Sequence, residues 1–313
     1  MTVYYGTEQI QNNHNAVVTA GTFDGVHIGH CKILSRLREA ADKIGGETVV
    51  ITYHPHPRLV LPSEKPGQVK LLTTLEEKTE LLHKEGIDKL VIIPFTLEFA
   101  SKSSDAFVRE ILVDKIGTRL LVIGHDHKFG RNREGGFEYL RDNAGRYGFE
   151  VEEIPAQDIE EVTVSSTRIR HALENGNLET ANEYLGRPYS LCGTVIHGKA
   201  EGRKLGYPTA NLQLSDKNKL IPAEGVYACK ADCNGEIYNA LLSIGTNPVF
   251  GDNPQTIEAW LMDFDGDLYG KNLRLNLHTY LREQKKFESL EALIDAMKAD
   301  EKRGREILSG VIW

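Results

Sequence analysis

The sequence predicts an α/β domain with a parallel sheet, followed by a mainly antiparallel β-barrel domain that ends in a helix. Short apolar runs alternate with helical patterns through the first 186 residues, as in parallel sheets whose strands are buried on both faces. After Gly186-Arg187-Pro188, polar and apolar residues alternate instead, which is typical of antiparallel strands. The length of 313 residues also suits two domains, because single domains usually contain about 50–250 residues. We therefore expect one domain at 1–186 and another at 187–313.

The first domain carries five apolar runs rich in Val and Ile, which are the expected parallel strands. They lie at residues 16–20, 48–52, 90–95, 120–124 and 149–154. An apolar stripe with helical spacing, residues 33–44, follows the first run. Thr74 and Glu77 have the spacing of a capping box, which predicts the start of another helix. Ligands of such sheets bind beyond the carboxyl ends of the strands.

The second domain contains a strong hairpin signal. Asn234-Gly235 separates two alternating runs, 226–232 and 236–244. Two further runs, 257–264 and 272–281, flank a turn rich in Asp and Gly. Apolar residues from Leu290 to Met297 then recur at helical spacing, so we expect a small barrel closed by a C-terminal helix.

Composition excludes several classes of protein. The net charge is −8, and neither the first 185 residues nor the remainder has the basic excess of a general nucleic-acid binder. The sequence lacks both an apolar run of about 20 residues and a secretory signal at its N-terminus. Its four scattered cysteines favour free thiols. We expect a cytoplasmic protein with small-molecule partners, and no membrane or nucleic acid among them; the oligomeric state stays open.

The segment 21–30, GTFDGVHIGH, joins the first expected strand to a helix. Free backbone N–H groups and the helix dipole favour an anion at such a junction. The dipole contributes only about 0.3–1 kcal/mol, whereas a thousandfold rate effect needs about 4 kcal/mol. Side chains must therefore supply most of any catalysis. His27 and His30, three residues apart on one helical face, are suited to that role. The alternative is a helix N-terminus with two solvated histidines.

Three further blocks lie in the first domain, at 52–57, 122–130 and 164–170. The first block has a non-functional alternative as an extended loop, and the second has one as a surface turn. Ser165 and Ser166 suit helix N-capping, which uses the same free donors as phosphate binding. Arg168 or Arg170 offers a charge-assisted contact to a polyphosphate. Histidine pairs at 54/56 and 125/127 raise a zinc alternative, which the absence of nearby cysteines disfavours.

In the second domain, residues 198–211, GKAEGRKLGYPTAN, combine glycines and basic residues with Thr209 and Asn211. The glycines allow close approach of the backbone to phosphates, and Thr209 and Asn211 offer oxygen ligands to Mg²⁺. The alternative is a mobile basic loop. The overlapping segment 193–200 lacks the hydroxyl residue of a P-loop, and the aspartates at 263, 265 and 267 lack the Gly and Glu of a calcium loop.

The order of these blocks resembles the bacterial bifunctional riboflavin kinase/FAD synthetase family over almost the whole chain. Residues 21–30 match the family pattern Gly-x-Phe-Asp-Gly-x-His-x-Gly-His in full, and residues 206–211 match Gly-x-Pro-Thr-Ala-Asn. Residues 245–251 resemble the family's Gly-x-Asn-Pro-x-Phe-Gly loop. The block at 122–130 departs from the pattern, because His127 stands where Phe is usual.

This resemblance implies a Rossmann-like nucleotidyltransferase sheet, a riboflavin kinase barrel, and two reactions that need ATP and Mg²⁺. Riboflavin would be phosphorylated to FMN, and FMN would be adenylylated to FAD with release of pyrophosphate. The implied catalytic residues are His27, His30 and Glu258. In the first domain, the implied ATP- and phosphate-binding residues are Gly21, Phe23, Asp24, Gly29, Ser165, Ser166, Thr167 and Arg168. The flavin-binding residues there are His56, Pro57 and Asp126.

In the second domain, the resemblance implies a nucleotide site and a flavin site. The ATP-binding residues would be Gly198, Gly202, Lys204, Gly206, Thr209 and Asn211, with Thr209 and Asn211 also holding the metal. Asn247 and Arg282 would contact the flavin. Two alternatives stay open: a nucleotidyltransferase for another phosphorylated acceptor, and a flavin-binding regulatory protein without turnover. The barrel motifs disfavour the first alternative, and the candidate catalytic residues disfavour the second.

Overall fold

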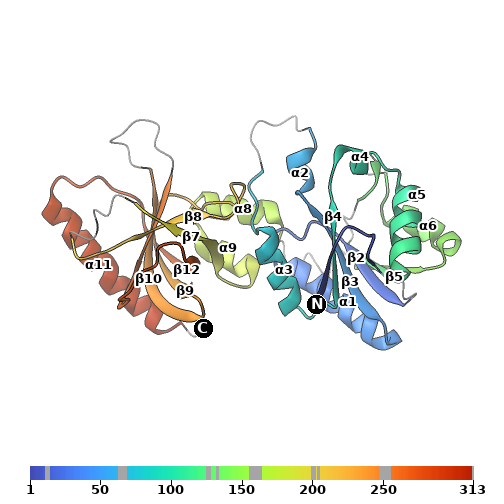
Figure 1. Ribbon diagram of the computed structural model, residues 1–313, viewed down its shortest axis with the longest axis horizontal. Coiled ribbons are helices and arrows are strands. Elements are labelled where there is room, and N and C mark those ends of the chain that lie inside the picture. Colours follow the sequence, from blue (N-terminus) through green and yellow to red (C-terminus); the bar gives the residue numbers. More distant parts are fainter. Residues whose placement is uncertain are drawn as a thin grey trace. The chain divides into compact units, whose positions relative to one another are not determined.

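The computed structural model describes residues 1–10, 15–62, 69–124, 128–131, 134–154, 164–198, 202, 205–246 and 255–311. The chain divides into two compact units, Met1–Ser166 and Thr167–Trp313 (Figure 1). Asp126, Lys204 and Asn247, three of the predicted site residues, lie outside the described residues. Of the helices that the structure describes, none combines the length and apolar character needed to cross a membrane.

The first unit is built on a six-stranded parallel sheet with the order β1-β4-β3-β2-β5-β6, which confirms the predicted fold. The strands are β1 (Thr2–Tyr5), β2 (Ala16–Ala20), β3 (Glu47–His54), β4 (Lys89–Pro94), β5 (Thr118–Gly124) and β6 (Glu150–Ile154). β1 was not among the predicted strands. This four-residue strand lies at the sheet edge beside β4 and is nowhere fully buried, so it lacks a continuous apolar run.

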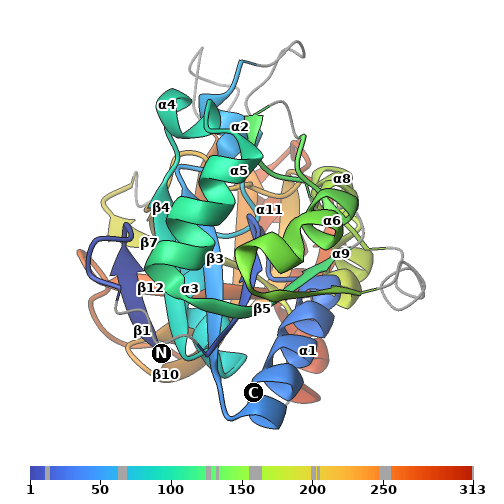
Figure 2. The same cartoon turned by 90° about the vertical axis from the view of Figure 1, so that its right-hand side faces the viewer.

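Helices cover both faces of this sheet (Figures 1 and 2). They are α1 (Ile28–Ile44), α2 (Pro57–Val60), α3 (Leu75–Lys84), α4 (Leu97–Ala100), α5 (Ser104–Phe107), the π-helix η1 (Val108–Ile116) and α6 (Phe137–Tyr147). Val17 packs with Leu34 and Leu82 of α1 and α3. The next residue, Val18, packs on the opposite face with Leu112 of η1. Neighbouring side chains of β2 therefore point to opposite faces of the sheet and pack in two separate hydrophobic cores.

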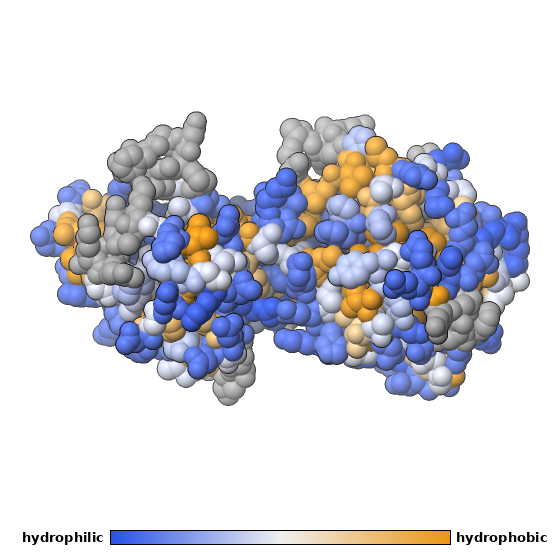
Figure 3. Space-filling model, in the orientation of Figure 1, coloured by the Kyte–Doolittle hydropathy of each residue, from blue (hydrophilic) through white to orange (hydrophobic). Residues whose placement is uncertain are grey.

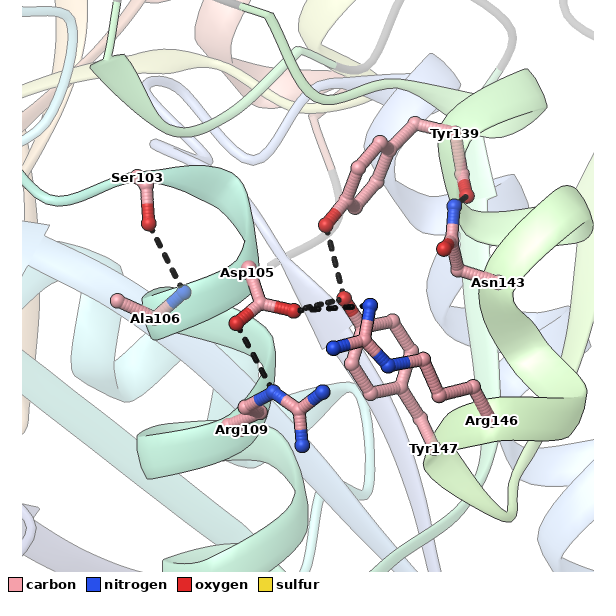
Figure 4. Close-up of polar contacts among 8 residues, drawn as sticks. All are labelled: Ser103, Asp105, Ala106, Arg109, Tyr139, Asn143, Arg146 and Tyr147. Carbon is pink, nitrogen blue, oxygen red and sulfur yellow. Dashed lines mark hydrogen bonds and ion pairs between the residues drawn. The ribbon is translucent and has the colours of Figure 1, made fainter.

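A polar cluster holds α5, η1 and α6 together on the second face (Figure 4). Asp105 accepts a hydrogen bond from the Tyr147 hydroxyl at 2.8 Å and one from Arg109 at 2.9 Å. Tyr139 and Tyr147 share a further hydroxyl bond at 2.8 Å. The bonds from Tyr147 and Arg109 lower the pKa of Asp105, because they stabilise its ionised form.

The second unit is a closed barrel with the order β10-β11-β8-β7-β12-β9 and antiparallel pairing, again as predicted. Its strands are β7 (Tyr189–Ile196), β8 (Ala210–Leu214), β9 (Gly225–Cys233), β10 (Glu236–Gly245), β11 (Thr256–Leu261) and β12 (Asn272–Arg282). Asn234 and Gly235 have φ angles of 56° and 91°, the left-handed pair of a type I′ hairpin turn between β9 and β10. β11 and β12 flank the Asp/Gly turn without pairing, because barrel closure gives each of them other neighbours.

Among the described residues, the helices that accompany the barrel are α8 (Ser166–Glu174), α9 (Leu178–Leu185) and α11 (Leu290–Ser309). The last is the predicted closing helix, and its Leu308 packs with Val226, Leu241 and Met262. Gly304 allows close packing at this contact, because a Cβ there would lie 2.8 Å from a methyl carbon of Leu241.

Candidate active sites

The turn between β2 and α1 carries the first site, and its backbone is unusual. Phe23, Gly25 and Val26 have φ angles of 46°, 87° and 37°. Non-glycine residues in the left-handed region cost about 1–3 kcal/mol each, and such strain persists only where surrounding contacts impose it. Gly21 precedes this turn, and a Cβ there would lie 3.1 Å from the Phe23 ring. The segment 21–26 is thus a tightly constrained turn.

His27 and His30 form a reciprocal capping box at the N-terminus of α1. The backbone N–H of His30 donates to His27 Nδ1 at 3.4 Å, and that of His27 donates to His30 Nδ1 at 3.3 Å. The two rings are stacked, with centroids 3.7 Å apart. Because both Nδ1 atoms accept, each neutral imidazole carries its proton on Nε2. The structure therefore brings together two ring N–H donors at a helix N-terminus, with Gly29 buried between them.

Asp24 is only 1% exposed, and its carboxylate is used inside the protein. Its Oδ1 accepts hydrogen bonds from the backbone N–H groups of Leu72 at 3.0 Å and Thr73 at 3.1 Å. The Thr73 hydroxyl donates to the same oxygen at 3.3 Å. A buried carboxylate needs such donors. Asp24 thus anchors the turn to the segment before α3.

The Ser166 hydroxyl, at the start of α8, donates to the backbone carbonyl of Asp24 at 2.9 Å. This bond brings one predicted phosphate-binding residue to the β2–α1 turn. The side chains of Ser165, Thr167 and Arg168 are exposed.

His56 is buried and caps α2, with its Nδ1 accepting from the Arg58 backbone N–H at 3.1 Å, and Pro57 is the first residue of that helix. Beside the carboxyl ends of β3 and β4 lies an aromatic cluster that the sequence analysis missed: Tyr53, Phe95 and Phe99. Their ring centroids are 5.7–5.9 Å apart. Figure 3 shows apolar surface over α2 and α4, where Leu61 and Leu97 are exposed. Aromatic residues at the ends of two predicted parallel strands were the available signal.

The second site joins β8 and β11 of the barrel. The Thr209 hydroxyl donates to Glu258 Oε2 at 3.0 Å, and Glu258 lies directly opposite Asn211 in the strand register. A Cβ on Gly198 would lie 2.1 Å from Asn211 Nδ2, so a larger residue there would displace the Asn211 side chain. The three predicted oxygen-bearing side chains, Thr209, Asn211 and Glu258, are thereby brought together.

Gly202 and Gly206 shape the loop before β8. A Cβ on Gly202 would lie 2.3 Å from the Tyr207 carbonyl oxygen, and Gly206 has a φ of 84°. Gly193 belongs to β7, in agreement with the rejection of a P-loop. Within the described ranges, no three His, Cys, Asp or Glu side chains are placed to hold a metal ion.

Arg282 makes a bidentate ion pair with Asp300, with bonds of 3.0 Å from Nε and 2.7 Å from Nη2. Both side chains are largely buried. This pair ties the end of β12 to α11, so the guanidinium group has a structural partner inside the barrel unit.

Comparison with known proteins bears on both units. A family model described as FAD synthetase matches residues 9–168, and one described as riboflavin kinase matches residues 185–308. The predicted division at 186 falls close to the start of the second match and stays a prediction. A crystal structure described as a macrolide-efflux protein from Streptococcus pneumoniae is 31% identical, with a TM-score of 0.87 over 97% of this chain and 99% of that one. That description concerns the other protein; the likeness supports the fold.

Two curated relatives are named bifunctional riboflavin kinase/FMN adenylyltransferase. The protein from Listeria monocytogenes is 39% identical over 293 residues, which is 93% of this chain and 92% of the relative. The protein from Pseudomonas fluorescens is 38% identical over 303 residues, which is 96% of each chain. On this similarity, and with both family models matching in order, the chain belongs to the bifunctional riboflavin kinase/FMN adenylyltransferase family.

Proposed function

We propose that this chain makes FAD from riboflavin in two steps, one on each unit. The barrel transfers the γ-phosphoryl group of ATP to riboflavin and gives FMN. The α/β unit transfers the adenylyl group of a second ATP to FMN and gives FAD and pyrophosphate. One observation carries this proposal: each unit assembles its own phosphate chemistry, the His27–His30 pair in one and the Thr209–Glu258 pair in the other.

In the adenylyl transfer, a phosphate oxygen of FMN attacks the α-phosphorus of ATP. The new P–O bond forms as the bond to the β-phosphate oxygen breaks, and pyrophosphate leaves. The Nε2–H groups of His27 and His30 donate to the phosphate oxygens and stabilise the charge that develops there. The backbone of the turn supplies further donors, and Asp24 shapes that turn from within. No covalent enzyme intermediate is needed.

We assign the remaining residues predicted for adenylyl transfer to substrate binding. Gly21, Phe23 and Gly29 keep the turn close to the nucleotide. The aromatic cluster at the ends of β3 and β4 suits a flavin ring, since aromatic side chains stack on flat conjugated systems. His56 and Pro57 are also assigned to the flavin. The residues assigned to the phosphates are Ser165, Ser166, Thr167 and Arg168, and Asp126 is assigned to the flavin.

In the kinase reaction, Glu258 accepts the proton of the terminal ribityl hydroxyl while the oxygen attacks the γ-phosphorus. The new P–O bond forms as the bond to the β-phosphate oxygen breaks, and ADP leaves. The side-chain oxygens of Thr209 and Asn211 fit Mg²⁺, which prefers hard oxygen ligands. When bound, this ion neutralises charge on the ATP phosphates. The Thr209 hydroxyl orients the Glu258 carboxylate through their 3.0 Å bond.

The other barrel residues receive binding roles. Gly198, Gly202, Lys204 and Gly206 are assigned to ATP, and Asn247 to the flavin. Arg282 is assigned to the flavin site through its hold on α11, since Asp300 occupies its guanidinium group.

We also place this protein in the cytoplasm, with small molecules as its partners and no nucleic acid. All four cysteines are free thiols, as in a reducing compartment. The net charge of −8 disfavours nucleic-acid binding.

Product chromatography tests the two-step proposal. The protein is incubated with riboflavin, ATP and Mg²⁺, and samples are separated over time. We expect FMN to rise before FAD, with pyrophosphate released in step with FAD. Riboflavin that stays unphosphorylated would contradict the kinase assignment, and FMN that never becomes FAD would contradict the adenylyltransferase assignment.

A further inference from the structure

Lys78, on α3, is a buried cation to which the chemistry above gives no role. Its side chain is 6% exposed. The ammonium group donates a hydrogen bond to the backbone carbonyl of Thr22 at 2.7 Å and one to the Thr52 hydroxyl at 3.4 Å. Both acceptors are neutral, and burying an ammonium group is costly unless it is well compensated. Because burying this ammonium group costs free energy, packing alone does not explain why a lysine occupies this position.

The position of Lys78 supplies that reason. Thr22 lies within the segment 21–30, one residue before the first left-handed residue of the turn. The Thr52 hydroxyl also donates to the Thr22 carbonyl, at 3.2 Å, so β3 and α3 hold the same oxygen. A few residues before Lys78, the Thr73 hydroxyl accepts the backbone N–H of Gly25 at 3.0 Å.

The segment 72–78 therefore binds both hydrogen-bond donors and hydrogen-bond acceptors of the turn. Its backbone N–H groups bind the Asp24 carboxylate, its Thr73 hydroxyl binds an N–H, and its lysine binds a carbonyl. Strained backbone persists only where neighbouring structure holds it. Here that neighbouring structure is the start of α3.

We propose that Lys78 is a positioning residue for adenylyl transfer: its ammonium group holds the Thr22 carbonyl and so sets the turn that places His27 and His30. This inference rests on the proposed adenylyltransferase function. It deepens that function by adding a residue that contacts neither substrate nor reacting atoms.

The ionisation of Lys78 agrees with a functional origin. Burial lowers its pKa to about 8, and the attraction of Asp24 only partly opposes this effect. Keeping this ammonium group charged therefore costs the folded protein free energy. An apolar side chain of similar length would avoid that cost, which makes Lys78→Met the informative substitution.

The experiment compares Lys78→Met with Lys84→Met in the full chain. Lys84 is exposed on the same helix, so it is a matched control. We measure kcat and KM for FAD formation from supplied FMN and ATP. For Lys78→Met we expect kcat to fall about 10- to 100-fold while KM for ATP changes less than about threefold. Riboflavin phosphorylation by the same chain should match the native rate, and Lys84→Met should match the native protein in both reactions.

A second variant separates positioning from folding. Lys78→Ala leaves space for a small amine, and we expect added ethylammonium to restore part of kcat in a saturable way. Native kcat in Lys78→Met would overturn the inference, as would a change confined to KM. If Lys78→Met fails to fold, absence of rescue in Lys78→Ala would overturn it, and rescue would support it. A native protein that forms no FAD would instead overturn the proposed adenylyltransferase function, on which the inference depends.

Discussion

The two candidate sites place groups for phosphate chemistry by different physical means. In the α/β unit, the site lies on irregular backbone, with Phe23 and Val26 in the left-handed region. Contacts from residues 72–78, about fifty positions further along the chain, hold this turn. In the barrel, Asn211 and Glu258 lie on regular strands, and the register of β8 and β11 puts them opposite each other, with Thr209 directly before β8.

This difference teaches where each site is vulnerable. A turn held by buried polar contacts should respond to changes in residues that never meet the substrate. A site on a strand ladder should tolerate such changes, because the ladder hydrogen bonds fix its geometry, and should respond mainly to loss of the reacting side chains.

Glu258→Gln should give the largest effect. The amide keeps the shape of the carboxylate but does not accept a proton, so riboflavin phosphorylation should fall about 10²–10⁴-fold. FAD formation from supplied FMN should stay near the native rate. Both rates come from product chromatography. Loss of both activities in a folded variant would show that the sites are not independent.

His30→Asn should lower FAD formation about 10²–10³-fold, because it removes the Nε2–H donor. The asparagine side chain keeps a polar acceptor near the former Nδ1 position, so the bond from the His27 N–H should survive. His30→Ala loses the cap as well and should be equally inactive but less stable. FMN should accumulate from riboflavin in both variants. A His30→Asn protein with native FAD formation would exclude a role for the Nε2 donor.

Lys78 should make stability depend on pH. Its pKa is about 8 in the folded protein against 10.5 unfolded, so the unfolded chain binds more protons between these values. Its contribution to the free energy of unfolding should therefore rise between pH 8 and 10.5, by up to about 3 kcal/mol. Urea unfolding measured across this range should show the rise in the native protein and a smaller one in Lys78→Met. If the free energy of unfolding depended on pH equally in both proteins, the lowered pKa of Lys78 would be contradicted.

Asp24→Asn should destabilise the α/β unit by about 1–3 kcal/mol, since an amide N–H₂ would face the backbone donors of residues 72 and 73. FAD formation should also fall, because the turn loses its anchor, whereas riboflavin phosphorylation should not. Chemical unfolding and the two rate assays check this. An equal fall in both rates would contradict a local role for Asp24.

Much of the fold follows from short-range patterns. The run 16–20 is β2 with the predicted bounds, and the Asn234-Gly235 pair forms the expected hairpin. The Thr74–Glu77 capping box opens α3, with the Glu77 N–H bound to the Thr74 hydroxyl at 3.2 Å. Such features depend on side chains a few residues apart. β1 escaped prediction because an edge strand needs no continuous apolar run.

In the candidate sites too, some features follow from short-range sequence patterns and others do not. The spacing of His27 and His30 predicts that they share a helical face. The structure instead places His27 at the N-cap of α1, with its ring stacked on that of His30 in a reciprocal capping box. Motif reasoning picked out Asp24 and Arg282, but it gave no sign that Leu72 and Thr73 bind the one and Asp300 the other. The periodicity of apolar residues indicates whether a position is buried or exposed. It does not indicate which distant residue forms a hydrogen bond or an ion pair with that position.

The sequence by itself determined the strand–turn–helix order around residues 21–30, the change from parallel to antiparallel patterning near 186, and the residue types available for phosphate chemistry. These depend on backbone preferences and near neighbours along the chain. Only the tertiary structure decided that Thr209 would meet Glu258 and that Lys78 would reach the Thr22 carbonyl. Such meetings between distant residues come from strand register and core packing, which act through the whole fold.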